Sequence, residues 1–149
     1  MTQVAVLVAL VVAALNAAAA ALGGWRWWRV EPSRAFWILC RTGQVANVVM
    51  AAVAGVLAAI GFDPSDGLYW LYAVLPVVVS FVAEQLRIAS AQTVLDGRDL
   101  EDAAAVGRLD EEGQRSVVLA IVRREMGIMA VSCGVIFFLA LRAAGTSGL

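Results

Sequence analysis

Four long apolar segments constrain the fold of this chain more than any other feature. They run from Val4 to Leu22, Val45 to Phe62, Leu68 to Ala83 and Met126 to Leu141. Hydrophobic residues make up 62% of the 149 residues, whereas an ordinary soluble domain has about half. We therefore expect an integral membrane protein that forms one transmembrane domain, with a spanning helix in each segment.

The third and fourth segments are too short to cross a bilayer by themselves. Each has 16 residues, or about 24 Å of helix, against a hydrocarbon core of about 30 Å. The third cannot extend toward its N-terminus, because the stretch Asp63–Gly67 predicts a turn. It must continue through Glu84 and Arg87, so ionisable side chains enter the membrane boundary. The predicted spans are 4–24, 36–62, 68–92 and 114–142.

The arginines determine the predicted orientation, because positive residues are retained on the cytoplasmic side of a membrane. All eleven basic residues are arginines, and ten of them flank the first and third connections, whereas Arg142 lies at the opposite end. We therefore expect both termini outside and connections one and three in the cytoplasm. The exclusive use of arginine is typical of a genome-wide codon bias, and we expect the inner (plasma) membrane of a bacterium.

The third connection, residues 96–116, is strongly acidic. It carries seven acidic residues and three arginines, a net charge of −4. Asp99 and Asp110 suit helix N-caps, which predicts a short helix near Leu100–Val106 and a long helix from about Glu111. The expected fold class is an all-α, antiparallel four-helix transmembrane bundle with a cytoplasmic helical hairpin between helices 3 and 4. This hairpin is either a solvated turn, or it contacts the Trp- and Arg-rich first connection or a basic partner.

Each apolar segment also has one face of small or polar residues at helical spacing. Such faces allow helices to pack closely in lipid, where side-chain amides bond across helices. We therefore expect these faces to point into the bundle. They are Ala13, Asn16 and Ala20; Cys40, Gln44, Asn47, Ala51 and Gly55; Tyr69, Ala73, Pro76, Ser80, Glu84, Arg87 and Ala91; and Arg123, Gly127, Ala130, Gly134 and Phe137.

Ionisable and amide side chains gather at the cytoplasmic ends of the predicted helices. An unpaired carboxylate in hydrocarbon is costly, so Glu84 is expected to pair with Arg41, Arg123 or Arg124. The cluster is either an ion-pair network that joins three helices or a site for an anionic headgroup, a metabolite or a neighbouring subunit. The candidate polar pocket comprises Arg41, Gln44, Asn47, Glu84, Arg87, Arg123, Arg124 and Glu125.

Two smaller features have structural interpretations. Cys40 is expected near the inner surface and Cys133 about halfway through the fourth helix, and this difference in depth argues against a disulfide. The Gly23-Gly24 pair is expected to end the first helix.

The chain has no histidine, which excludes His-ligated haem, the usual zinc and copper sites, and a His-based catalytic triad. We predict no catalytic residues, cofactor or metal, and no nucleic-acid partner. We expect a non-enzymatic protein that acts by association, as an accessory or assembly subunit or a homo-oligomer. Its expected partners are membrane lipids and either another protein or its own copies, with an anionic ligand as a candidate at the cytoplasmic end.

Two alternatives use the same charged residues. The first is a small oligomeric transporter or channel in which Glu84 is the coupling carboxylate and the arginines bind an anion. The second is a lipid-acting enzyme that uses Glu84 or Glu125 with Arg41, Arg123 and Arg124 on a phosphate group.

Overall fold

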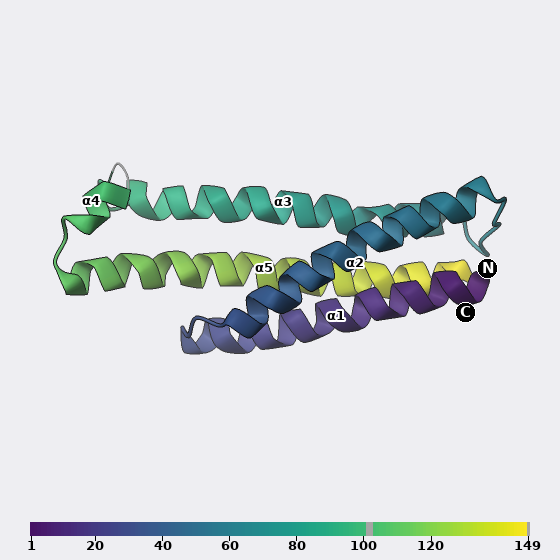
Figure 1. Cartoon of the computed structure of the whole chain (residues 1–149), viewed down its shortest axis with the longest axis horizontal. Helices are drawn as coiled ribbons and strands as arrows, with labels where there is room; N and C mark the ends of the chain where they lie inside the picture. Colours follow the sequence, from purple (N-terminus) through teal and green to yellow (C-terminus); the bar gives the residue numbers. More distant parts are fainter. Residues whose placement is uncertain (101–102, 149) are drawn as a thin grey trace.

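A computed structural model describes residues 1–100 and 103–148, and 86% of these residues are helical. The prediction of an all-α protein is confirmed for them. Four of the described helices are long and apolar enough to span a membrane. The helices are α1 (Thr2–Arg29), α2 (Arg34–Ala59), α3 (Leu68–Asp96), α4 (Ala103–Gly107) and α5 (Glu111–Ser147) (Figure 1).

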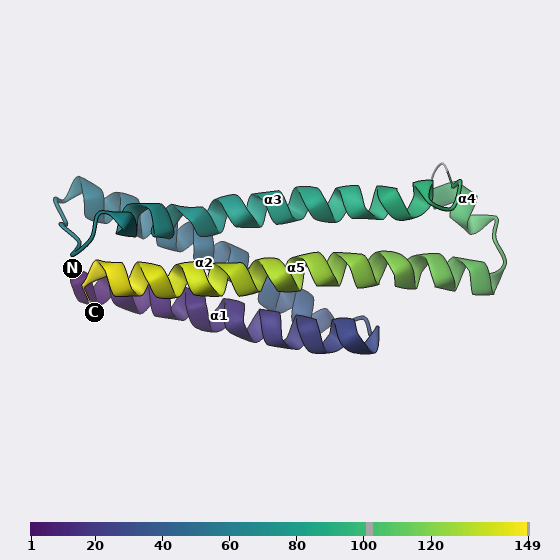
Figure 2. The same cartoon turned by 180° about the vertical axis from the view of Figure 1, so that it is seen from behind.

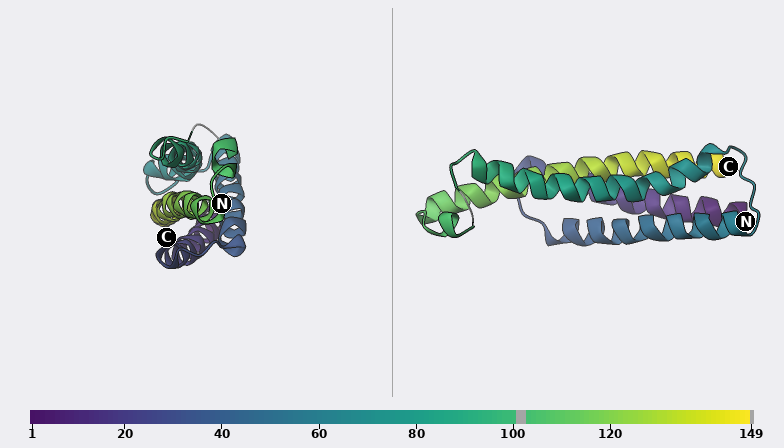
Figure 3. Two further views of the ribbon diagram at one scale, coloured as in Figure 1. Left: turned by 90° about the vertical axis from the view of Figure 1, so that its left-hand side faces the viewer. Right: turned by 90° about the horizontal axis from the view of Figure 1, so that it is seen from above.

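Helix α5 lies between α1 and α3, and α2 crosses this layer obliquely (Figures 1 and 3). Helix α2 packs mainly against α1 and α3. Both termini and the connection 60–67 lie at one end of the molecule, called here the terminal end. At the opposite hairpin end, α3 and α5 continue past the α1–α2 connection and are joined through α4 (Figure 2).

The connection between α2 and α3 is attached to the last turn of α5. The backbone N–H of Asp66 and the hydroxyl of Ser65 both donate to the Thr146 carbonyl, at 3.1 and 2.9 Å. These bonds satisfy a carbonyl that the end of a helix would leave without a partner. They also hold the terminal end of the bundle together.

The terminal half of the bundle is packed mainly by small side chains. Alanines bring α1 and α5 close together, and the ring of Tyr69 packs edge-on against Phe62 with centroids 5.7 Å apart. We call this cluster the terminal core: Ala5, Ala9, Val12, Ala13, Met50, Ala54, Leu57, Phe62, Tyr69, Ala73, Ile136, Ala140, Ala143 and Ala144.

A second cluster, the middle core, lies closer to the hairpin end, and Gly23 packs against it. A Cβ at Gly23 would lie 2.3 Å from the Phe36 ring and 2.9 Å from the Ala130 Cβ. The expectation that Gly23-Gly24 ends the first helix is wrong, because Gly23 is needed for close packing and α1 continues to Arg29. The middle core comprises Ala19, Phe36, Cys40, Ala83, Met126, Met129, Ala130 and Cys133.

One of the two predicted caps in the acidic connection is confirmed. The carboxylate of Asp110 accepts the Gly113 N–H at 3.0 Å and caps α5. Asp99 instead takes a left-handed conformation with φ 54°, whereas an N-cap is usually extended. Leu100 is not helical, so the predicted cap at Asp99 is wrong, and the described part of α4 runs from Ala103 to Gly107. Part of the predicted short helix, residues 101–102, lies outside the described residues.

Two predicted inward-facing glycines lie on the outside of the bundle. A Cβ at Gly55 or Gly134 would meet nothing within 4 Å, and the buried residues nearby are Ala54, Cys133 and Ile136. On α2, the two successive steps of four residues from Asn47 through Ala51 to Gly55 together advance about 80° around a helix with 3.6 residues per turn. Gly55 is therefore rotated away from the face on which Asn47 is buried.

Candidate functional site

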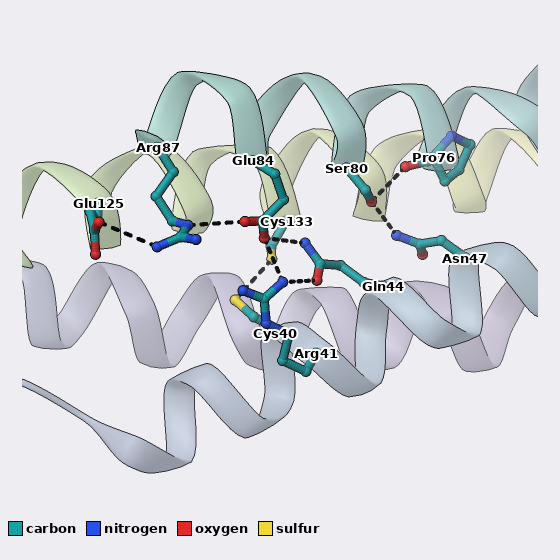
Figure 4. A network of polar contacts seen from close by, with 10 residues as sticks. All are labelled: Cys40, Arg41, Gln44, Asn47, Pro76, Ser80, Glu84, Arg87, Glu125 and Cys133. Atoms are coloured by element: carbon teal, nitrogen blue, oxygen red, sulfur yellow. Dashed lines mark hydrogen bonds and ion pairs between the residues drawn. The ribbon is translucent and has the colours of Figure 1, made fainter. Parts of the chain in front are cut away.

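Polar side chains from α2, α3 and α5 meet next to the middle core (Figure 4). Glu84 on α3 accepts hydrogen bonds from Arg41 Nη1 at 2.7 Å, Gln44 Nε2 at 2.8 Å and Arg87 Nε at 3.0 Å. Two guanidinium groups and one amide therefore surround a carboxylate whose side chain is 21% exposed. This geometry compensates the charge of Glu84 in a mostly apolar bundle.

Arg87 extends the network from α3 to α5. Its Nη1 lies 3.3 Å from Glu125 Oε1, and its guanidinium carbon lies 5.8 Å from the centre of the Trp37 ring. Two arginines and two glutamates thus alternate across three helices. We call Arg41, Gln44, Glu84, Arg87 and Glu125 the polar layer.

A chain of uncharged polar groups lies next to the polar layer on its terminal side. Asn16 Nδ2 donates to Asn47 Oδ1 at 3.2 Å, Asn47 Nδ2 donates to Ser80 Oγ at 2.9 Å, and Ser80 donates to the Pro76 carbonyl at 2.7 Å. Asn16 and Asn47 are 2% and 0% exposed. We call this chain the amide ladder; it joins α1, α2 and α3 through groups that would be costly to leave unpaired.

The structure brings together most of the candidate pocket residues, but not all. Arg41, Gln44, Glu84, Arg87 and Glu125 form the polar layer, and Asn47 belongs to the adjoining amide ladder.

Of the three alternative partners expected for Glu84, Arg41 pairs with it, whereas Arg123 and Arg124 do not. Both are exposed, and the Arg123 guanidinium lies 5.4 Å from the centre of the Trp27 ring on α1. A step of about 100° per residue turns positions 123 and 124 away from the face on which Glu125 meets α3. Arg87, on the same helix as Glu84, takes the place that they were expected to occupy.

The two cysteines are neighbours, which corrects the expectation that they lie at different depths. Cys40 Sγ and Cys133 Sγ are 3.7 Å apart, and both side chains are buried (Figure 4). The expected depth of each cysteine was counted from the ends of the apolar segments. Because α5 extends far beyond the apolar segment toward the hairpin end, and α2 begins at Arg34, the two helices meet at these residues.

A cavity of about 400 Å³ opens beside the polar layer, between the start of α2 and the α3–α5 hairpin. Sequence reasoning missed five of its eight lining residues. Two of these, Arg34 and Trp37, lie on the same face of α2 as Arg41 at helical spacing. The lining residues are Pro32, Ser33, Arg34, Trp37, Arg41, Arg87, Val122 and Glu125.

The arrangement favours binding over bond-breaking chemistry. The cavity presents guanidinium groups, which donate hydrogen bonds to anions, and its one hydroxyl, Ser33 Oγ, accepts the Phe36 N–H at 3.2 Å as the cap of α2. Among residues 1–100 and 103–148, no group of three or more His, Cys, Asp or Glu side chains is placed to hold a metal ion.

Comparisons with protein-family models, curated proteins and solved structures found no match to this chain. The function is therefore inferred from the charges, cavities and surfaces of the chain itself.

Proposed function

We propose that this is an integral membrane protein of the bacterial inner membrane that acts by association, as an accessory or assembly subunit or as a homo-oligomer. The outward faces of the four long helices support membrane insertion. Leu7, Val45, Phe81, Val131 and Phe138 are each more than 60% exposed, and they come from all four long helices. Contact of such large apolar side chains with lipid is favourable, whereas their contact with water is unfavourable.

The arginine distribution supports an orientation with both termini outside and the hairpin end in the cytoplasm. Ten of the eleven arginines belong to the hairpin side, where positive residues are retained. Arg142 is the exception, and its guanidinium lies 5.8 Å from the centre of the Tyr72 ring near the terminal end.

The projecting α3–α5 hairpin is the observation that carries the proposal of association. It continues beyond α1 and α2, so its far end is not needed to complete the bundle (Figures 1 and 2). Its tip lies away from the α1–α2 connection, which it was expected to contact as one alternative. Five acidic residues there are exposed: Asp96, Asp99, Asp110, Glu111 and Glu112.

This negative surface suits a partner segment that carries arginine or lysine. Charge complementarity of this kind selects partners and accelerates their encounter. Anionic lipid headgroups would repel the tip, which favours a protein partner over the membrane surface. The first connection of a second copy of the chain, with Arg26 and Arg29, offers one such basic segment.

The proposal can be tested by photo-cross-linking in native membranes. A photoreactive residue replacing Glu112 should give a discrete protein adduct, whereas one replacing the lipid-facing Phe138 should not. An adduct of twice the protein's mass would identify a homo-oligomer, and any other defined mass would identify a different subunit. Neutralising the tip by Asp96→Asn, Asp99→Asn and Glu111→Gln together should remove the adduct, and Arg142→Gln should leave it unchanged.

Absence of any adduct at position 112, together with a strictly monomeric protein in native mass spectrometry from mild detergent, would contradict the proposal. Asp110 is left unchanged in this variant, because its side chain caps α5. Loss of the adduct can therefore be assigned to charge and not to unfolding of the hairpin.

The alternative of an oligomeric transporter or channel has less support from the geometry. A permeation path needs polar groups or water through its full depth, and the terminal core is built from apolar side chains. Any path would therefore have to form between subunits. Proteoliposome flux that falls with Glu84→Gln and not with Gln85→Glu would favour this alternative.

A further inference from the structure

The cavity beside the polar layer has the size and position of a small-ligand site. Its volume of about 400 Å³ lies within the range of about 300–1,000 Å³ that is usual for such sites. Its lining residues lie at the start of α2, on the stretch where α2 diverges from α3 on its way to the α1–α2 connection (Figure 1). One wall comes from the start of α2 and the other from Arg87, Val122 and Glu125 of the hairpin.

The charges around this cavity favour an anion. Arg34, Arg41 and Arg87 line it together with one carboxylate, that of Glu125. When Glu84, which pairs with Arg41 and Arg87, is included, the cluster still has a net charge of +1. An anion with one or two negative charges would neutralise this excess.

Several guanidinium N–H groups remain for a ligand. Arg41 uses Nη1 for both of its hydrogen bonds, to Gln44 and Glu84. Arg87 uses Nε and Nη1 for its hydrogen bonds to Glu84 and Glu125. The guanidinium group of Arg34 has no hydrogen bond or ion pair with any described residue. Three arginines line one cavity, and each has guanidinium N–H groups left to donate. Together they can donate to the several oxygens of a phosphate group.

The backbone and the tryptophans add to this arrangement. The cavity includes Ser33 and Arg34, the cap and first residue of α2, so the positive end of the helix dipole also faces the space. Trp37 and Val122 provide an apolar wall. Trp25 and Trp28, 61% and 77% exposed, lie near the end of α1 beside the same connection, and tryptophan favours the depth of lipid headgroups.

We propose that this cavity binds a phosphate group through Arg34, Arg41 and Arg87. Two sources carry the same chemistry: the headgroup of an anionic phospholipid such as phosphatidylglycerol, and free inorganic phosphate. The lipid source rests on the membrane insertion proposed above, whereas free phosphate does not. Neither source depends on the acidic tip of the hairpin.

The test uses the full chain in mild detergent and two titrations, read by native mass spectrometry and by thermal unfolding. The probes are phosphatidylglycerol, with zwitterionic phosphatidylcholine as the comparison of zero net charge, and inorganic phosphate. Arg34→Gln is the test variant, because Arg34 is exposed and outside the polar layer. Arg124→Gln is the matched control: it removes the same charge from an exposed arginine of the same half that does not line the cavity.

One bound phosphatidylglycerol is expected for the original protein and for Arg124→Gln. Arg34→Gln should weaken this binding about tenfold, the effect of losing one charged hydrogen bond, and Arg34→Lys should restore part of it because only the charge returns. Selective binding of the lipid identifies the headgroup as the ligand. Binding of inorganic phosphate with the same dependence on Arg34 identifies a free phosphate compound.

Equal affinity in Arg34→Gln and Arg124→Gln, or no preference for phosphatidylglycerol over phosphatidylcholine together with no phosphate binding, would overturn the proposal. Cross-linking at position 112 reads the proposed association separately. The two proposals can therefore fail independently.

Discussion

At the terminal end, α1 and α5 approach each other through alanines such as Ala9 and Ala140, which are 1% and 0% exposed. In the polar layer, α2, α3 and α5 are connected by long charged side chains. The difference follows from the oblique course of α2 (Figure 3). Where helices lie close together, small residues make the contact; where α2 diverges, arginines and glutamates bridge the gap and a cavity remains.

The terminal core and the polar layer are stabilised by two different physical causes. The terminal core depends on shape, because small residues let helices approach closely and make extensive van der Waals contacts. The polar layer depends on charge compensation, because a partly buried carboxylate without partners is costly. The two regions should therefore respond to different substitutions.

Glu84→Ala is expected to have the largest effect. It leaves Arg41 and Arg87 without their shared counter-charge and should lower the free energy of unfolding by about 2–3 kcal/mol. Gln85→Ala, at the exposed neighbouring position, is the control and should change it by less than about 0.5 kcal/mol. Reversible unfolding in detergent micelles measures both. Equal effects would show that the polar layer does not stabilise the bundle.

Ala140→Leu should come next, with a loss of about 2 kcal/mol. Added methyl and methylene groups cannot fit a fully packed contact without moving a helix. Ala52→Leu, at an exposed position on α2, is the matched control and should be nearly neutral. A tolerated leucine at position 140 in the same unfolding assay would mean that shape does not dominate the terminal core.

Gly23→Ala tests whether close packing against a small residue also occurs outside the terminal core. Gly23 lies beside the middle core, yet an added Cβ would meet the Phe36 ring. Overpacking should outweigh the gain in helix propensity of about 1 kcal/mol, for a net loss of about 1 kcal/mol. Gly24→Ala meets nothing within 4 Å and should stabilise the protein slightly. If both variants gain stability, close packing does not extend beyond the terminal core.

The smallest perturbation is oxidation of the cysteine pair. Mild treatment with diamide should join Cys40 and Cys133 within one chain, because their sulfurs are 3.7 Å apart and a small shift reaches disulfide distance. The bond forms with loss of two hydrogens to the diamide, which intact-mass spectrometry detects. Cys40→Ser is the control. Dimers linked through either cysteine, with no internal bond, would contradict the placement of α2 beside α5.

Several local features were predictable because they depend on neighbouring residues. The Asp110 cap follows from an acidic residue placed before a helical run. The burial of Asn16 and Asn47 follows from amides within apolar segments. That Glu84 would be charge-compensated follows from the cost of an isolated carboxylate.

Other features depended on how the helices cross, and sequence reasoning placed them incorrectly. It offered Arg41, Arg123 or Arg124 as partners of Glu84, whereas the structure pairs Glu84 with Arg41 and with Arg87 on the same helix. It also separated Cys40 from Cys133. Both errors came from treating the helices as straight, parallel and equal in depth, whereas α2 crosses obliquely and α5 extends past it.

Taken alone, the order of amino acids determined four long apolar helices, an acidic connection and a carboxylate that needs partners, because hydropathy, charge and helix propensity act over a few neighbouring residues. Only the tertiary structure decided which arginines meet Glu84, why Gly23 must lack a side chain, and where a cavity opens between Arg34 and the hairpin. Those features depend on the crossing angle and rotation of each helix, which the packing of the whole bundle sets.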